Sequence, residues 1–186
     1  MKNIVTTLLL GVALASFSGC SHIASLVGLN GTYSFTGASI PDAATTFSVA
    51  YIPNNTADFA TLSNELTEAL RERFMNQTRL SQVPEGGDLA FEGEITLVTE
   101  APSAIGASTT GSNGAAAATS NRVTVTVQIL FTNIVQPELS FENRQTFTAY
   151  YDYDTVNPRS AVENDLVEEV VTTLVDNIFN AAVAQW

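Results

Sequence analysis

Lysine, histidine and cysteine are almost absent from this chain. Of its 186 residues, one is a cysteine, one is a histidine, and the single lysine is the second residue. A lone cysteine excludes an internal disulfide and a zinc site built from several thiolates. The only histidine is His22, close to the N-terminus. A Ser-His-Asp arrangement therefore has no histidine to draw on in the rest of the chain.

Positive charge is scarce as well. The chain has 7 basic and 19 acidic residues, and its formal net charge is −12. Binding to nucleic acid depends on neutralising phosphates with basic side chains, so this balance argues against that class of partner. It also argues against electrostatic docking on an anionic membrane surface. Any attachment to a membrane must come from another source.

The first 20 residues have the pattern of a bacterial lipoprotein signal. Lys2 precedes an apolar stretch at 4–15, and small residues lie directly before Cys20. The stretch is too short to span a bilayer, which takes about 20 residues. The pattern predicts cleavage of residues 1–19 and lipidation of Cys20, and loss of Lys2 takes the formal net charge to −13. An ordinary signal peptide with a cysteine there by chance is the alternative.

The remaining chain is expected to form a tether at 20–32 and a single domain at 33–186. Apolar residues four apart predict a helix from 62 to 77. A capping box, Ser160 to Glu163, predicts the start of a second helix of about 25 residues. Alternating apolar and polar residues predict four strands, at about 45–52, 89–97, 123–131 and 140–151.

The order β-α-β-β-β-α predicts an α+β fold, with two helices packed on one face of a four-stranded, mostly antiparallel mixed sheet. The other sheet face, rich in Thr, Glu and Gln, is expected to meet solvent or a partner. Residues 101–121 contain only Ala, Ser, Thr, Gly, Asn, Pro and one Ile. Such a small, uncharged segment predicts a flexible loop.

Few residues suggest bond chemistry. Glu92 and Glu94 share the outer face of one strand, and paired carboxylates can act as acid and base, although solvated carboxylates are the simpler interpretation. Asp152 and Asp154 have the spacing of a calcium-loop fragment, without the glycine and distal glutamate of a complete loop. We predict no catalytic residue, no metal site and no cofactor.

Binding residues are the remaining candidates. Tyr150, Tyr151 and Tyr153 predict either a sugar-stacking patch or edge-strand packing. Arg122 opens a strand beside the predicted loop, and Arg159 lies just before the capping box. Either guanidinium could meet a phosphate bidentately, and a solvated arginine at a loop end is the alternative.

Several stretches together resemble a known family, the LptE lipopolysaccharide-assembly lipoproteins. The resemblance runs from about Tyr33 to Trp186 and rests on the order and spacing of its segments. These are Tyr-Ser-Phe-Thr-Gly-Ala-Ser-Ile-Pro at 33–41, Leu-Ser-Asn-Glu-Leu-Thr-Glu-Ala-Leu at 62–70, Gly-Gly-Asp-Leu-Ala-Phe-Glu-Gly-Glu-Ile at 86–95, Ser-Ala-Val-Glu at 160–163 and Ile-Phe-Asn-Ala-Ala-Val-Ala at 178–184.

The resemblance implies a non-enzymatic lipoprotein on the periplasmic side of the outer membrane. Such a protein plugs and helps assemble an LptD-type β-barrel, which delivers lipopolysaccharide to the outer leaflet. Family members are expected to bind that lipid through basic residues near loop ends. This chain offers only Arg122 and Arg159 by position, so direct binding is left open.

Two other functions fit parts of the sequence. A periplasmic lipoprotein that binds and activates a cell-wall synthase, or another envelope complex, would also be an anchored domain without an active site. An envelope hydrolase would have to rest on Glu92 and Glu94 alone. Co-purification distinguishes the activator from the barrel plug: a cell-wall enzyme as partner would support the activator, and a large β-barrel would support the plug.

Overall fold

The computed structural model describes residues 40–106 and 117–183. The predicted signal at 1–19, Cys20, the tether at 20–32 and His22 lie outside these ranges. In chain order the elements are β1 (Thr46–Val49), α2 (Leu62–Gln77), β2 (Ser81–Gln82), β3 (Leu89–Gly106), β4 (Ala117–Asn133), the 3₁₀ turn η1 (Pro137–Leu139), β5 (Gln145–Asp154) and α3 (Arg159–Val183).

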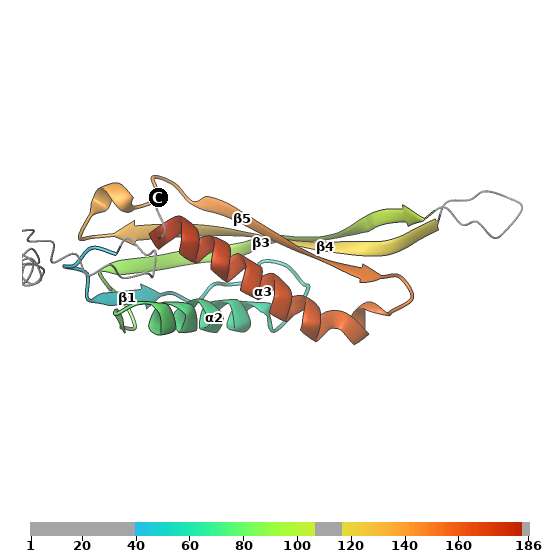
Figure 1. The fold of residues 1–186 in the computed structure, drawn as a ribbon, viewed down its shortest axis with the longest axis horizontal. Coiled ribbons are helices and arrows are strands. Elements are labelled where there is room, and N and C mark those ends of the chain that lie inside the picture. Colours follow the sequence, from blue (N-terminus) through green and yellow to red (C-terminus); the bar gives the residue numbers. More distant parts are fainter. Residues whose placement is uncertain (1–39, 107–116, 184–186) are drawn as a thin grey trace, which may run out of the picture. The chain divides into compact units, whose positions relative to one another are not determined.

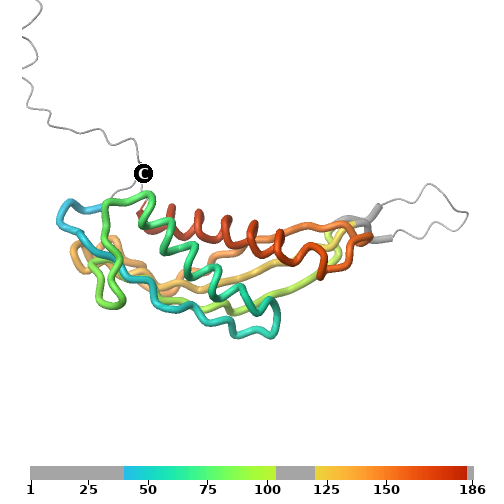
Figure 2. The backbone as a smooth tube through the Cα atoms, turned by 90° about the horizontal axis from the view of Figure 1, so that it is seen from below, coloured from blue at the N-terminus to red at the C-terminus, as the bar shows by residue number. Residues whose placement is uncertain are grey.

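The predicted fold class is confirmed. The two helices cover one face of a mixed sheet, and the other face is open (Figures 1 and 2). The sheet order is β2-β1-β3-β4-β5. Strand β1 is parallel to both β2 and β3, whereas β3, β4 and β5 are antiparallel neighbours. The sheet has five strands instead of four because β2 is only 2 residues long, too short for a periodicity.

The core lies between the helices and the covered face of the sheet. Strand β4 contributes every second residue from Val123 to Phe131, all of them buried. Phe74 of α2 is fully buried at the centre, with ring centroids 4.7 Å from Phe91 of β3 and 5.0 Å from Phe179 of α3. Phe91 stacks in turn on Phe131, with centroids 4.8 Å apart. This row of aromatic rings joins both helices to the central strands.

A β-bulge in β3 changes which side chains face the helices. The register shifts between Ile95 and Leu97, so the alternation of apolar and polar residues inverts there. Ile95 is buried, but Leu97 is 51% exposed on the open face, and Val98 packs against the core instead. The sequence pattern placed Leu97 on the buried face; that expectation was wrong because a single extra residue reverses strand parity.

The β3–β4 hairpin is longer than the sequence predicts. Strand β3 continues to Gly106 and β4 begins at Ala117, so much of the segment predicted as a loop at 101–121 is paired strand. Small side chains do not prevent this pairing, because ladder hydrogen bonds come from the backbone. The described ends of both strands extend beyond the first turn of α3 (Figure 1). Residues 107–116 lie outside the described ranges.

The boundaries of the last strand and helix also differ from the prediction. Strand β5 covers 145–154 and not 140–151, because η1 and a turn occupy the preceding residues. Helix α3 begins at Arg159, so Ser160 lies inside the first turn instead of capping it. The Ala161 amide donates to the Pro158 carbonyl at 2.9 Å. The length of 25 residues agrees with the prediction.

A short connection crosses the open face of β1 to lead from β2 to β3. Gly87 lies so close to β1 that a Cβ there would meet the Phe47 carbonyl carbon at 2.5 Å. Its amide donates to the Ser48 hydroxyl at 3.2 Å. The next residue, Asp88, accepts the amides of Thr45 and Thr46 at 2.8 and 2.9 Å. These hydrogen bonds hold the pKa of the Asp88 carboxyl below its usual value.

Candidate functional site

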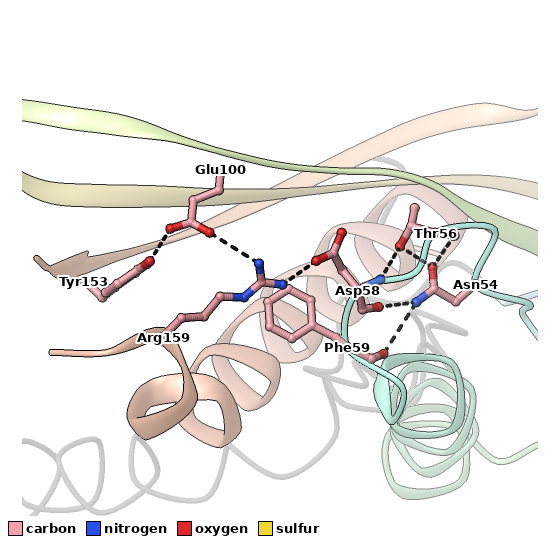
Figure 3. Close-up of polar contacts among 7 residues, drawn as sticks. All are labelled: Asn54, Thr56, Asp58, Phe59, Glu100, Tyr153 and Arg159. Carbon is pink, nitrogen blue, oxygen red and sulfur yellow. Dashed lines mark hydrogen bonds and ion pairs between the residues drawn. The ribbon is translucent and has the colours of Figure 1, made fainter.

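Arg159 lies where four segments meet, at the start of α3. Its Nη2 is 2.5 Å from Asp58 Oδ1, in the loop before α2, and its Nη1 is 3.3 Å from Glu100 Oε2 on β3. The guanidinium also lies over the Phe59 ring, 4.4 Å from the centroid. Figure 3 shows Arg159 between the two carboxylates. The hydrogen bond with Asp58 raises the pKa of the Arg159 guanidinium above its usual value.

Strand β5 joins the same cluster through Tyr153. Its hydroxyl donates to Glu100, and this hydrogen bond raises the pKa of the phenol. Asn121 of β4 donates to Glu100 Oε1 at 3.2 Å and to the Tyr153 hydroxyl at 3.3 Å. The cluster therefore links three strands to the first turn of α3. The cluster lies at the end of the sheet beyond the row of aromatic rings.

The loop that supplies Asp58 is itself held by side-chain hydrogen bonds. Asn54 Oδ1 accepts the Thr56 amide at 2.9 Å, and Asn54 Nδ2 donates to the Asp58 carbonyl at 2.7 Å (Figure 3). Such asparagine turns are local alternatives to regular structure. The backbone of Phe59 has a φ of 52°, in the left-handed region that residues other than glycine rarely adopt. Its buried ring under Arg159 helps to hold that conformation.

The other candidate arginine, Arg122, points to the opposite face of the sheet. Its Nε and Nη2 donate to the two carboxylate oxygens of Asp152 on β5, at 2.8 and 2.7 Å. Its guanidinium also lies 3.9 Å from the centroid of the Tyr150 ring. The hydrogen bonds with Arg122 hold the pKa of the Asp152 carboxyl below its usual value. The two arginines are thus not brought together into one site.

Each guanidinium already has a carboxylate partner, and this decides what it can do. An incoming phosphate must displace Asp152 from Arg122, or Asp58 and Glu100 from Arg159. An arginine with two charged hydrogen bonds is well suited to fixing neighbouring strands and loops in place. The geometry therefore gives both residues a positioning role within the fold, and anion binding requires an exchange of partners.

The remaining candidates are dispersed. Glu92 and Glu94 share the open face of β3 as predicted, and Glu94 accepts a hydrogen bond from Asn55 at 2.6 Å. Tyr150 faces outward and is 56% exposed, whereas Tyr153 is buried under α3. The three tyrosines therefore do not form one exposed patch, because neighbours along a strand point to opposite faces.

The described ranges also contain neither a metal-binding cluster nor a membrane-spanning helix. Across 40–106 and 117–183, histidine, cysteine, aspartate and glutamate side chains do not gather in a group of three or more that could hold a metal ion. Within the same residues, neither helix is long and apolar enough to cross a membrane.

The sequence did not indicate which carboxylates pair with the two arginines. Asp58 is 101 positions from Arg159, and Asp152 is 30 positions from Arg122. No local pattern connects residues so far apart. The Pro53-Asn54-Asn55 turn was a usable signal for the loop, but its contact with α3 depends on how the sheet and helices pack.

Comparison with known proteins identifies the family. A family model described as "LptE: Lipopolysaccharide-assembly" matches residues 44–182. No curated protein sequence matches the chain. Among solved structures, a minor lipoprotein from Acinetobacter baumannii is similar, with a TM-score of 0.45 and 15% identity over 73% of this chain and 90% of that one.

Two other bacterial lipoproteins show similar values. The solution structure of uncharacterized lipoprotein B from Nitrosomonas europaea has a TM-score of 0.46 and 12% identity, covering 73% of this chain and 80% of that one. The rare lipoprotein B from Shewanella oneidensis has a TM-score of 0.36 and 12% identity, covering 72% and 89%. The family model spans nearly all of the described domain, from just before β1 to the last turn of α3. The chain belongs to the LptE lipopolysaccharide-assembly family.

Proposed function

We propose that this protein is a lipid-anchored, non-enzymatic subunit on the periplasmic side of the outer membrane. It plugs an LptD-type β-barrel and helps that barrel assemble, so that lipopolysaccharide can reach the outer leaflet. The observation that carries the proposal is the family match over residues 44–182. The lipoprotein signal predicted at 1–19, directly before Cys20, supports the anchoring.

The architecture is consistent with a plug. The lumen of a large β-barrel is polar, and a domain inside it has to present polar side chains. The open face of the β3-β4-β5 sheet does this, with alternating threonines along β4 and β5. The work required is binding and positioning, and these need no local bond chemistry.

Direct contact with lipopolysaccharide through Arg122 and Arg159 is a further part of the proposal. The lipid A phosphates would replace carboxylates as partners of these arginines. A phosphate offers bidentate acceptors comparable to those of Asp152, so the exchange at Arg122 conserves the type of interaction. Exchange at Arg159 also releases the loop that carries Asp58.

Purification of the full-length, tagged protein from native outer membranes tests the anchoring and the barrel partnership. We expect one large β-barrel protein to co-purify after mild detergent extraction. The Cys20→Ala variant should lose incorporated fatty acid and leave the outer-membrane fraction. Recovery of a cell-wall synthase instead of a barrel would replace this proposal with an envelope-activator function.

Binding of purified lipopolysaccharide to the full-length protein in detergent tests the arginine contacts. Arg122→Ala and Arg159→Ala should each weaken binding if their guanidinium groups meet phosphates. Arg79→Ala is the control, because Arg79 makes an exposed ion pair with Asp42 at 3.2 Å. Equal affinity in all three variants would remove both arginines from the lipid site and leave the plug function standing.

A further inference from the structure

The open face of the sheet contains an uncharged patch directly behind the β-bulge of β3. Strand pairing places Leu97, Thr126 and Thr148 side by side in one row across β3, β4 and β5. The adjacent row, in the same register, consists of Thr99, Thr124 and Tyr150. We call these six residues the threonine patch. None of them is charged, on a chain whose formal net charge is −12.

The side chains of the threonine patch are available for contact. Leu97 and Tyr150 are 51% and 56% exposed. Within the residues that the structure describes, the hydroxyls of the four threonines make no hydrogen bond to another protein group; the neighbouring Thr96 hydroxyl donates to the backbone carbonyl of Thr126 at 3.2 Å. Leu97 and Tyr150 therefore give this part of the open face apolar surface that a partner can cover.

Charged groups surround the patch, and they are paired. At one side Arg122 and Asp152 form their bidentate ion pair. At the other side Glu94 is 3.4 Å from Arg144. A centre without charges that includes an exposed tyrosine, within a charged and polar rim, is the usual composition of a protein interface.

The outer surface of the helices is different. On α2 and α3 the residues that face away from the sheet are largely acidic, and the basic residues among them are in ion pairs with Glu68 and Asp176. The acidic side chains of the two helices are Glu65, Glu68, Glu72, Glu163, Asp165, Glu168, Glu169 and Asp176. Desolvating this surface against a partner would bury several like charges, which is costly.

We propose that the threonine patch is the centre of the surface that contacts the wall of the barrel lumen. This inference rests on the proposed function. Barrel strands direct alternate polar side chains into the lumen, so Ser, Thr, Asn or Gln opposite the patch can satisfy the four hydroxyls. Two sheets that pack face to face lie about 10 Å apart, a distance that threonine and leucine side chains fill. Beyond the paired rim, Glu92 and Asp154 on the same face are complementary to lysine or arginine in the surrounding wall.

A second copy of this chain is a poorer occupant. It would bring the same negative net charge, so close approach of two copies would bring acidic groups such as Glu92 and Asp154 nearer to one another. Such like-charge contacts disfavour association. The chemistry therefore favours a neutral or basic wall over self-association.

Matched charge insertions test the patch in the full-length protein in native membranes. Thr148→Asp and Leu97→Asp place a carboxylate at the patch, and Thr173→Asp places the same group on the exposed side of α3. We expect each patch variant to reduce co-purification of the barrel about tenfold or more, because an unpaired charge at an interface is strongly unfavourable. Thr173→Asp should leave recovery of the barrel unchanged. Thr148→Ser, which keeps the hydroxyl at the same position, should also recover as much barrel as the unmodified protein.

Thermal unfolding of each purified variant separates lost contact from lost fold, and a photo-crosslinker at Thr126 gives a second readout. The crosslinker should trap the barrel. Wild-type recovery with both patch variants, an equal loss with Thr173→Asp, or a crosslink to a second copy would overturn the inference while leaving the plug function intact. Recovery of no barrel with the unmodified protein would overturn both.

Discussion

The two faces of the sheet use nearly the same side-chain shapes for opposite purposes. Along β4, Val123, Val125 and Val127 are fully buried beneath the helices, whereas Thr124 and Thr126 between them face outward. Valine and threonine are both branched at Cβ and both suit a strand. The covered face is therefore held by burial of apolar surface, and the open face presents hydroxyl groups. The difference lies in one atom per residue, a methyl group replaced by a hydroxyl.

Removing the central ring of the covered face should have the largest effect. Phe74 is fully buried, and its ring centroid is 5.5 Å from that of Phe47. Phe74→Ala leaves a cavity between α2, α3 and the sheet, and we expect a loss of about 3–5 kcal/mol in the free energy of unfolding. Denaturant titration measures it. Met75→Ala is the control, because Met75 is exposed; equal losses would show that this row of rings is not the centre of the core.

Exchanging the two side-chain types on β4 tests the comparison directly. Val125→Thr buries a hydroxyl among apolar neighbours, and we expect it to cost about 1–3 kcal/mol of stability. Thr124→Val, one position earlier, should change stability by about 0.5 kcal/mol or less, because that side chain faces outward. Thermal unfolding of both variants provides the measurement. Similar costs for the two changes would mean that both faces are packed alike.

The end of the sheet beside the first turn of α3 is held by the charged cluster around Arg159. Arg159→Ala removes the ion pairs with Asp58 and Glu100 and the contact with Phe59. Because these groups are partly exposed, we expect a cost of about 1–2 kcal/mol. Hydrogen exchange should increase first in the 53–61 loop, while the amides of β4 near Phe131 stay protected. Exchange that rises uniformly over the domain would contradict a local role for Arg159.

The sequence alone predicted what local periodicity determines. Helix α2 was expected at 62–77 and is found there, because Leu66, Leu70 and Phe74 recur every four residues. The bulge at Ile95 and Leu97 was missed, since one inserted residue leaves no periodic signal. The site was predicted less well than the fold. Both candidate arginines were named, but their carboxylate partners are set by tertiary packing and could not be read from neighbouring residues.

Asp88 offers the smallest and most specific test, on the open side of β1. Its carboxylate accepts two amides and the Thr45 hydroxyl, and its pKa lies below the ordinary value of 3.8. A depressed folded-state pKa means that its contribution to stability is present above the unfolded-state pKa. That contribution is lost as pH falls through the folded-state pKa. Asp88→Asn should therefore be less stable than the parent protein at neutral pH, and the two should converge in acid.

Thermal unfolding of both proteins from about pH 7 down to about pH 2, well below the ordinary carboxyl pKa, measures this convergence. Asp42→Asn is the matched control, because within the described residues the contact of the Asp42 carboxylate is an exposed ion pair with Arg79. We expect that variant to follow the parent protein at every pH. A constant difference between Asp88→Asn and the parent would mean that the amide replaces the carboxylate poorly for steric reasons. The connection across β1 would then be held by the close approach of Gly87 to Phe47 and not by the charge of Asp88.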